Sequence, residues 1–140
     1  MMRVVIDCNI WIICLTSKSP YHQIYKDFIE GKFDICVTNE ILFEYEEIIQ
    51  LKYGTATATS FLSLLRELPN VIFIEPWYQW NLIKADNDDN KYVDCAIAGQ
   101  TDNIVTQDNH FSILKTITFP KVSYCLIDEF MEMINKENIE

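Results

Sequence analysis

Glycine and proline are scarce in this chain, which has three glycines and four prolines among 140 residues. So few of these residues leave little room for a flexible linker, a collagen-like repeat or a disordered tract. No internal repeat, low-complexity run or shift of composition marks a second domain. Because 49% of the residues are hydrophobic, the chain can bury a core of its own. We therefore expect residues 1–140 to form one domain.

Long apolar runs are also missing. The longest uncharged stretch near the N-terminus, residues 8–17, is too short to span a bilayer. The residues around it lack the length and the small-residue cleavage site of a signal peptide. We therefore expect no membrane association and a cytoplasmic location.

The signatures of several enzyme classes are absent. Without a glycine-rich phosphate loop or a nucleophile elbow, the sequence gives no basis for a nucleotide-binding protein or a triad hydrolase. The five cysteines form no C-x-x-C pair, and the two histidines show no ligand spacing with them, so no zinc site is expected. The cysteines are interpreted as reduced, buried, small hydrophobic residues. They are Cys8, Cys14, Cys36, Cys95 and Cys125.

Positive charge is in short supply, since 11 Lys and Arg residues face 21 Asp and Glu residues and the net charge is -10. This balance argues at first sight against a nucleic-acid partner, whose phosphates attract Lys and Arg. However, acids that bind cations lose part of their charge, and lysines distant in sequence could gather on one face. The charge is therefore a caution and does not exclude nucleic acid.

Short apolar runs alternate with helical patterns along the chain, which predicts βαβ units and a parallel sheet covered on both faces. We expect an α/β fold, a three-layer α/β/α sandwich around a parallel sheet of four to five strands. Residues 76–88 are expected to form a loop. The predicted strands are residues 4–6, 35–37, 71–74, 104–105 and 122–127. The predicted helices span about 20–31, 39–53, 57–68 and 89–99, with a short helix through Phe111 and Leu114 and a terminal helix from Asp128.

Two aspartates follow predicted strands. Asp7 comes directly after residues 4–6, and Asp108 comes three residues after Val105. Ligands of such sheets bind beyond the carboxyl ends of the strands, where both aspartates fall. Either one alone would more often be a turn former or a helix cap. Together with acids on the following helices, the two aspartates indicate a ligand site more specifically than either does alone.

Two of the predicted helices carry those further acids. Asp86, Asp88 and Asp89 precede the helix at 89–99, with capping as the alternative explanation for Asp88 and Asp89, and Asp94 lies inside the helix. On the helix at 39–53, Glu44 and Glu46 fall at the borders of the apolar face, whereas the other two glutamates point to solvent. Periodicity alone leaves Glu44 and Glu46 as equal candidates.

Four segments resemble the motifs of the PIN-domain family, in the family's order. Residues 5–9 (V-I-D-C-N) resemble its opening, 38–44 (T-N-E-I-L-F-E) its second acidic segment, and 105–108 (V-T-Q-D) its V-T-x-D motif. Residues 88–96 (D-D-N-K-Y-V-D-C-A) are similar to the third acidic helix of the toxin components of toxin–antitoxin systems, the VapC-like ribonucleases. The resemblance covers the chain from residue 3 to about 130.

This resemblance implies a metal-dependent endoribonuclease that hydrolyses RNA phosphodiester bonds with Mg²⁺ or Mn²⁺, and it selects Glu44. It also implies a cognate antitoxin as protein partner and allows a homodimer. Where many PIN domains have an aspartate this chain has Asn90, which leaves Asp89 and Asp94 as rivals for the third carboxylate. The expected catalytic residues are Asp7, Glu44, Asp94 and Asp108, the metal ligands are Asp7, Asp94, Asp108 and Asp89, and the supporting residues are Asn9, Thr106, Asn90 and Lys91.

Helical geometry favours Asp94 over Asp89. Asp94 lies four residues beyond Asn90, so the two side chains project from one face, whereas Asp89 sits at the helix start. We therefore predict Asp94 as the metal-binding carboxylate, Asp89 as second choice, and Lys91 as a phosphate contact.

Other interpretations remain open. One is a catalytically weak PIN fold that binds protein or RNA, and the presence of Asn90 favours this interpretation. A phosphoacceptor domain of the response-regulator type would need an acidic pair after the first strand, but Cys8 and Asn9 follow Asp7. An aromatic cluster could stack RNA bases or simply pack the loop onto the domain or a dimer partner. Its members are Trp77, Tyr78 and Trp80.

Overall fold

The computed structural model describes residues 1–139 and contains a five-stranded sheet in the order β3-β2-β1-β4-β5. Every neighbouring pair is parallel, which confirms the predicted α/β fold. The central strand β1 begins with Arg3 and continues with three fully buried residues, Val4, Val5 and Ile6. The strands are β1 (Arg3–Ile6), β2 (Asp34–Val37), β3 (Val71–Phe73), β4 (Asn103–Val105) and β5 (Tyr124–Cys125).

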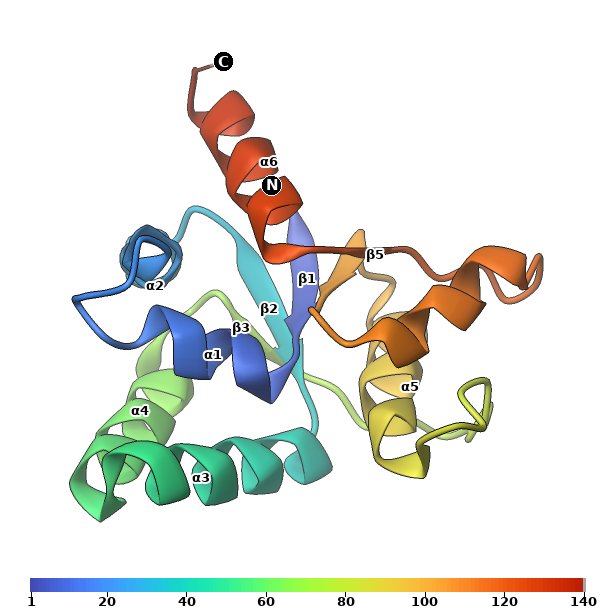
Figure 1. Ribbon diagram of the computed structural model, residues 1–140, viewed down its shortest axis with the longest axis horizontal. Helices are drawn as coiled ribbons and strands as arrows, with labels where there is room; N and C mark the ends of the chain where they lie inside the picture. The colour runs from blue at the N-terminus through green and yellow to red at the C-terminus, as the bar shows by residue number, and fades with distance from the viewer. Residues whose placement is uncertain (140) are drawn as a thin grey trace.

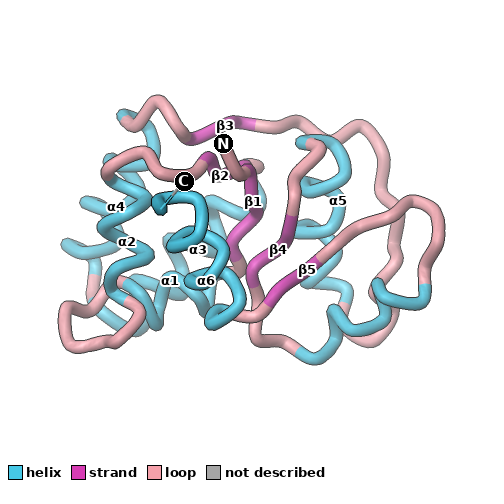
Figure 2. Tube along the Cα trace, turned by 90° about the horizontal axis from the view of Figure 1, so that it is seen from above, coloured by secondary structure: helices cyan, strands magenta, loops and turns pink. Residues whose placement is uncertain are grey.

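Helices cover both faces of this sheet (Figures 1 and 2). Helix α5 lies on one face and α1, α2 and α6 lie on the other, while α3 and α4 pack side by side next to α1. The α-helices are α1 (Cys8–Cys14), α2 (His22–Ile29), α3 (Asn39–Tyr53), α4 (Thr55–Glu67), α5 (Asn90–Gly99) and α6 (Ile127–Ile139), and the 3₁₀-helices are η1 (Asn87–Asp89) and η2 (Asn109–Thr116).

Helix α5 packs very closely on the sheet through Gly99. A Cβ atom at this position would lie 2.8 Å from Sγ of Cys36 in β2, so a side chain could be accommodated only if β2 or α5 shifted. The close approach fixes the height of α5 above the sheet, and with it the acids at the start of the helix.

Helix α1 is an element that the sequence analysis did not predict. Asn9 is the one polar residue of this short helix, and Ile10, Trp11 and Cys14 are fully buried, so the sequence shows no polar face with a helical period. The Trp11 ring lies 5.2 Å from that of Phe28 and 5.0 Å from that of Phe61, at the centre of the core. Because α1 follows β1 directly, it also fixes the direction of Asp7, its N-cap residue.

Other element boundaries differ by a few residues. Helix α2 begins at His22 because Ser19 and Pro20 form a turn first, in which Ser19 Oγ accepts a hydrogen bond from the Tyr21 N–H at 3.0 Å. Strand β5 has two residues where six were predicted, because only Tyr124 and Cys125 pair with β4. All five cysteines are free and buried, as predicted. Within residues 1–139, no helix has both the length and the apolar character needed to cross a bilayer.

Candidate functional site

The ends of β1 and β4 bring two sequence-distant segments together. Ile6 pairs with Val105, so the residues that follow, Asp7 and Thr106, lie at the same edge of the sheet. Thr106 Oγ1 donates a hydrogen bond to Asp7 Oδ2 at 2.7 Å and accepts one from the Asp108 N–H at 3.0 Å. One buried hydroxyl therefore holds the Asp7 carboxylate beside the Asp108 backbone, which is the juxtaposition that the strand-end argument predicts.

Asp7 is almost completely buried, with 4% of its surface exposed. Burial raises the pKa of its carboxyl group above the ordinary value, and the hydrogen bond from Thr106 opposes that rise. The Asn9 N–H also reaches Asp7 Oδ1, at 3.4 Å. Asn9 thus supports Asp7 through its backbone, and its exposed side chain is not needed for this contact.

Glu44 reaches the same place from α3. Its Oε1 accepts a hydrogen bond from the Tyr92 hydroxyl, and its Oε2 lies 2.7 Å from Lys91 Nζ. Burial alone would raise the pKa of Glu44, but the hydrogen bonds from Lys91 and Tyr92 outweigh it and the pKa is lowered. Ligand atoms of Asp7, Cys8 and Glu44 all lie within 4.8 Å of one another, and we call these three residues the inner group.

A second set of potential ligands lies nearby, which we call the outer group: Asp86, Asp89, Asp108 and His110, whose ligand atoms also lie within 4.8 Å of one another. His110 Nδ1 is 3.2 Å from Asp89 Oδ2 and 3.3 Å from Asp108 Oδ1. Burial, and then the negative charge of Asp108, raise the pKa of Asp89 to about 7. The acids of the outer group therefore repel one another when all are ionised.

The structure places Asp94 in neither group. Its Oδ1 accepts a hydrogen bond from the Trp80 N–H at 3.1 Å, on the side of α5 that faces the loop before η1. Asn90 does share this face, as predicted, but its side-chain amide bonds both backbone groups of Ile83. The face is directed at the loop, so the structure brings Asp89, and not Asp94, together with Asp108 and His110.

Asp89 lies in the outer group because it ends η1, before the regular turns of α5. Its side chain makes no capping hydrogen bond, contrary to the alternative considered from the sequence. Lys91 Nζ binds Glu44 and the Asp88 carbonyl oxygen, which is 2.9 Å away. The contact of Lys91 with a phosphate stays a prediction.

Three further residues of the site were not expected from the sequence: Cys8, Tyr92 and His110. His110 lacks zinc-type spacing with the cysteines, but its position two residues after Asp108 is a signal that could have identified it. Tyr92 looked like a core residue of an apolar helix face. It is buried, and its hydroxyl nevertheless accepts the Cys8 N–H at 3.2 Å and donates to Glu44.

The potential ligand atoms of the inner and outer groups suit a divalent cation. The two groups supply mainly carboxylate oxygens, the hard ligands that Mg²⁺ and Mn²⁺ prefer. The raised pKa of Asp89 shows that its ionised form lacks sufficient positive compensation from the protein. A cation bound by the outer group would provide it.

Two solved structures resemble this fold. The crystal structure of VapBC2 from Rickettsia felis bound to a DNA fragment from their promoter matches with a TM-score of 0.61 and 16% identity, covering 89% of this chain and 98% of that chain. VapC20 from Mycobacterium tuberculosis, a sarcin–ricin loop cleaving toxin, matches with a TM-score of 0.56 and 12% identity, covering 78% and 92%. At these identities the likeness concerns the fold alone.

No curated protein sequence matches the chain significantly. A family model described as a PIN domain matches residues 3–110, which includes β1, α3, α5, β4 and both groups of acids. The chain belongs to the PIN-domain family.

Proposed function

We propose that this chain is a divalent-metal-dependent endoribonuclease that hydrolyses RNA phosphodiester bonds, with residues 1–140 as its single nuclease domain. The observation that carries the proposal is the Thr106 hydroxyl, which holds Asp7 beside Asp108 at the junction of the inner and outer groups. Carboxylates gathered at strand ends in a member of the PIN-domain family support phosphodiester hydrolysis.

Asp7, Asp89 and Asp108 are the proposed ligands of Mg²⁺ or Mn²⁺. Bound there, the cation would lower the pKa of a water molecule and stabilise charge at the scissile phosphate. Thr106 keeps Asp7 oriented through its hydroxyl. Asp86 and His110 flank the same carboxylates and orient Asp89 and Asp108.

Glu44 has a separate role in this proposal. Because Lys91 and Tyr92 lower its pKa, Glu44 stays ionised at neutral pH and can accept a hydrogen bond from the attacking water. Lys91 and Tyr92 are positioning residues that act through Glu44.

The proposal includes a role as the toxin component of a toxin–antitoxin pair. Support comes from the two similar structures, which bear the names of a VapBC pair and a VapC toxin.

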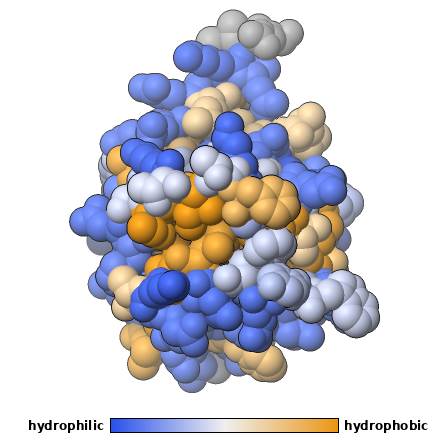
Figure 3. Space-filling model, turned by 90° about the vertical axis from the view of Figure 1, so that its right-hand side faces the viewer, coloured by the Kyte–Doolittle hydropathy of each residue, from blue (hydrophilic) through white to orange (hydrophobic). Residues whose placement is uncertain are grey.

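The chain also has a surface suited to a partner. Figure 3 shows an apolar hollow on the face formed by η2 and the loop before η1. It encloses about 550 Å³ and is lined in part by Leu82, Ile83, Ile113, Ile117 and His110 of the outer group.

We propose that a small antitoxin covers this hollow and reaches the acids next to it. Apolar side chains would fill the hollow, and an arginine would bind the carboxylates of the outer group in a bidentate manner. Co-expression of the tagged chain with the small protein encoded beside it should yield a stable complex and relieve growth inhibition. Growth unaffected by the chain alone, with no small protein bound, would count against this part of the proposal. Analytical ultracentrifugation of the free chain tests for the homodimer.

A nuclease assay tests the central proposal. The purified chain is incubated with a panel of structured and single-stranded RNAs, with Mg²⁺, with Mn²⁺ and with EDTA, and Asp108→Asn serves as control. Cleavage is expected only with a divalent ion and only in the wild type. RNA binding without cleavage under every condition would identify a non-catalytic RNA-interaction module and refute the proposed activity.

A further inference from the structure

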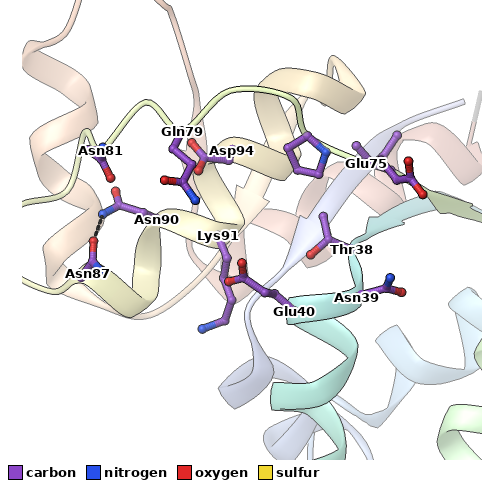
Figure 4. A pocket seen from close by; sticks show the side chains of 12 residues that line it. Thr38, Asn39, Glu40, Glu75, Gln79, Asn81, Asn87, Asn90, Lys91 and Asp94 are labelled. Atoms are coloured by element: carbon purple, nitrogen blue, oxygen red, sulfur yellow. Dashed lines mark hydrogen bonds between the residues drawn. The ribbon is translucent and has the colours of Figure 1, made fainter.

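A polar pocket lies between the start of α3 and α5, and Lys91 is one of its lining residues (Figure 4). It encloses about 420 Å³, within the range of small-molecule sites. Its walls come from the start of α3, residues 74–81 and α5. Lys91 lines the pocket and at the same time binds Glu44 of the inner group, so the pocket and the proposed catalytic site share this residue.

Asp94 is the buried acid of this pocket. It is 8% exposed and receives one hydrogen bond, from the Trp80 N–H, although an ionised carboxylate can accept about four. Glu40 and Glu75 add two more carboxylates to the lining. Lys91 is the one cation among the lining residues described, and its Nζ is bound to Glu44 and the Asp88 carbonyl. Such a pocket repels phosphate and favours a ligand that offers N–H donors.

The amide side chains narrow the ligand class further. Gln79, Asn81 and Asn87 lie around Asp94 and Asn90 in Figure 4 and present both donors and acceptors. A guanidinium group carries only donors and would leave the amide N–H groups without partners. The edge of a nucleobase carries both kinds of group, so it matches the lining better.

An aromatic surface adjoins the pocket. Trp77, Tyr78 and Trp80 line a second hollow, and Asp94 contributes to both. The Trp77 side chain is 94% exposed and Tyr78 is 63% exposed, so their rings are available for contact with an unpaired base. Stacking on such rings contributes about 1–3 kcal/mol per base in proteins that bind single-stranded nucleic acid.

We propose that this pocket receives a guanine base of single-stranded RNA, with Asp94 accepting the N1–H and N2–H₂ donors of guanine together. Adenine and cytosine present one amino group beside an acceptor, and uracil presents one ring N–H between two carbonyl groups, so guanine alone offers two adjacent donors. The inference rests on the proposed function in naming RNA as the substrate, and it makes cleavage dependent on a nearby guanine.

Binding in the absence of divalent ions tests the pocket separately from catalysis. Labelled oligouridylates that carry one central G, A, C or inosine are titrated with the full chain in EDTA, and fluorescence anisotropy gives each Kd. The G oligonucleotide is expected to bind about tenfold more tightly than the A and C forms, because a bidentate base contact has this order of discrimination. Inosine, which lacks the N2 amino group, should fall between G and A.

Asp94→Asn should remove most of this preference, because its amide keeps one acceptor for the Trp80 N–H but loses the paired acceptors for guanine. Glu132→Gln is the matched control, because it also removes one negative charge but at an exposed side chain of α6. It should keep the wild-type preference. Circular dichroism checks that both variants fold. The inosine comparison uses the unchanged protein, so it tests the pocket even if Asp94→Asn misfolds.

Equal affinity for all four oligonucleotides would overturn the inference, as would an unchanged G preference in folded Asp94→Asn. Competition by N-acetyl-arginine amide without any G preference would also overturn it and point to an arginine of a protein partner. Selective G binding without cleavage in Mg²⁺ would uphold the pocket while refuting the nuclease proposal. Cleavage in Mg²⁺ without a G preference would uphold the nuclease proposal while refuting the pocket.

Discussion

Glu44 of the inner group and Asp89 of the outer group are both carboxylates, but their surroundings shift the pKa in opposite directions. In the inner group, each oxygen of Glu44 faces a donor, Tyr92 or Lys91, and the pKa is lowered. In the outer group, Asp89 faces Asp108 with His110 as shared partner, and the pKa rises to about 7. The comparison shows that the chain itself stabilises the ionised form of Glu44 with two donors, whereas the surroundings of Asp89 favour its protonated form.

Asp7→Asn should have the largest effect, because Asp7 joins the two groups. The change keeps an acceptor for the Asn9 N–H but removes the charge, so we expect RNA cleavage to fall by at least about a hundredfold. Thermal unfolding should show a Tm close to that of the wild type. Cleavage at the wild-type rate would mean that the site has been assigned wrongly.

Asp89→Asn and Asp94→Asn separate the outer group from the polar pocket. The Mg²⁺ concentration needed for half-maximal cleavage should rise about tenfold or more in Asp89→Asn, because a ligand of the cation is lost. In Asp94→Asn this concentration should stay near that of the wild type, while the choice of cleavage sites changes. If only Asp94→Asn raised the Mg²⁺ requirement, the original preference for Asp94 would be restored.

The stability of the metal-free chain should depend on pH in a direction set by Asp89. Its pKa is raised in the folded state, from 3.8 to about 7, so the folded chain binds the proton more tightly than the unfolded chain does. The contribution of this bound proton to the free energy of unfolding is fully present at low pH and is lost as pH rises towards about 7. In differential scanning calorimetry, added Mg²⁺ should therefore raise Tm more at about pH 8 than at about pH 5. In Asp89→Asn this difference should shrink, and an unaltered difference would assign the effect to other acids.

Tyr92→Phe should give the smallest change of these variants. It removes a buried hydroxyl that donates to Glu44 and accepts the Cys8 N–H, so urea denaturation should show a loss of about 1–2 kcal/mol. Tyr21→Phe is a suitable control because its hydroxyl donates to Asp128 at the surface, and its cost should be about half a kcal/mol or less. Equal costs for both variants would show that Tyr92 does not support Glu44.

Sequence reasoning was effective where position along a strand decides the outcome. Asp7 and Asp108 follow β1 and β4, and the carboxyl ends of parallel neighbours meet at one edge whatever the helices do. The helical period narrowed the glutamates of α3 to Glu44 and Glu46, and the family resemblance then selected Glu44, which the structure has half-buried. The inference about Asp7 and Asp108 needs only the local pattern and the parallel sheet.

The same reasoning failed where one irregular segment determines the surroundings of another. Asn90 and Asp94 share a polar face, but that face contacts the backbone of Trp80 and Ile83 in a loop without any periodic pattern. Nothing in the local pattern predicts where this loop lies, so the side of α5 that faces the acids could not be inferred. Helix α1 was missed because all of its seven residues except Asn9 are apolar, so its short sequence has no amphipathic period.

The order of the sheet has a consequence for protein synthesis. Thr106 binds Asp7 across a sequence separation of 99 residues, because β4 pairs with β1. Ribosomes extend the chain from its N-terminus, at about 5–20 residues per second. A nascent chain that has emerged only through α4 carries Asp7 and Glu44 but lacks Asp108, Thr106 and the strand that aligns them. The proposed nuclease therefore has no assembled centre with which to attack the messenger that encodes it until β4 has left the exit tunnel.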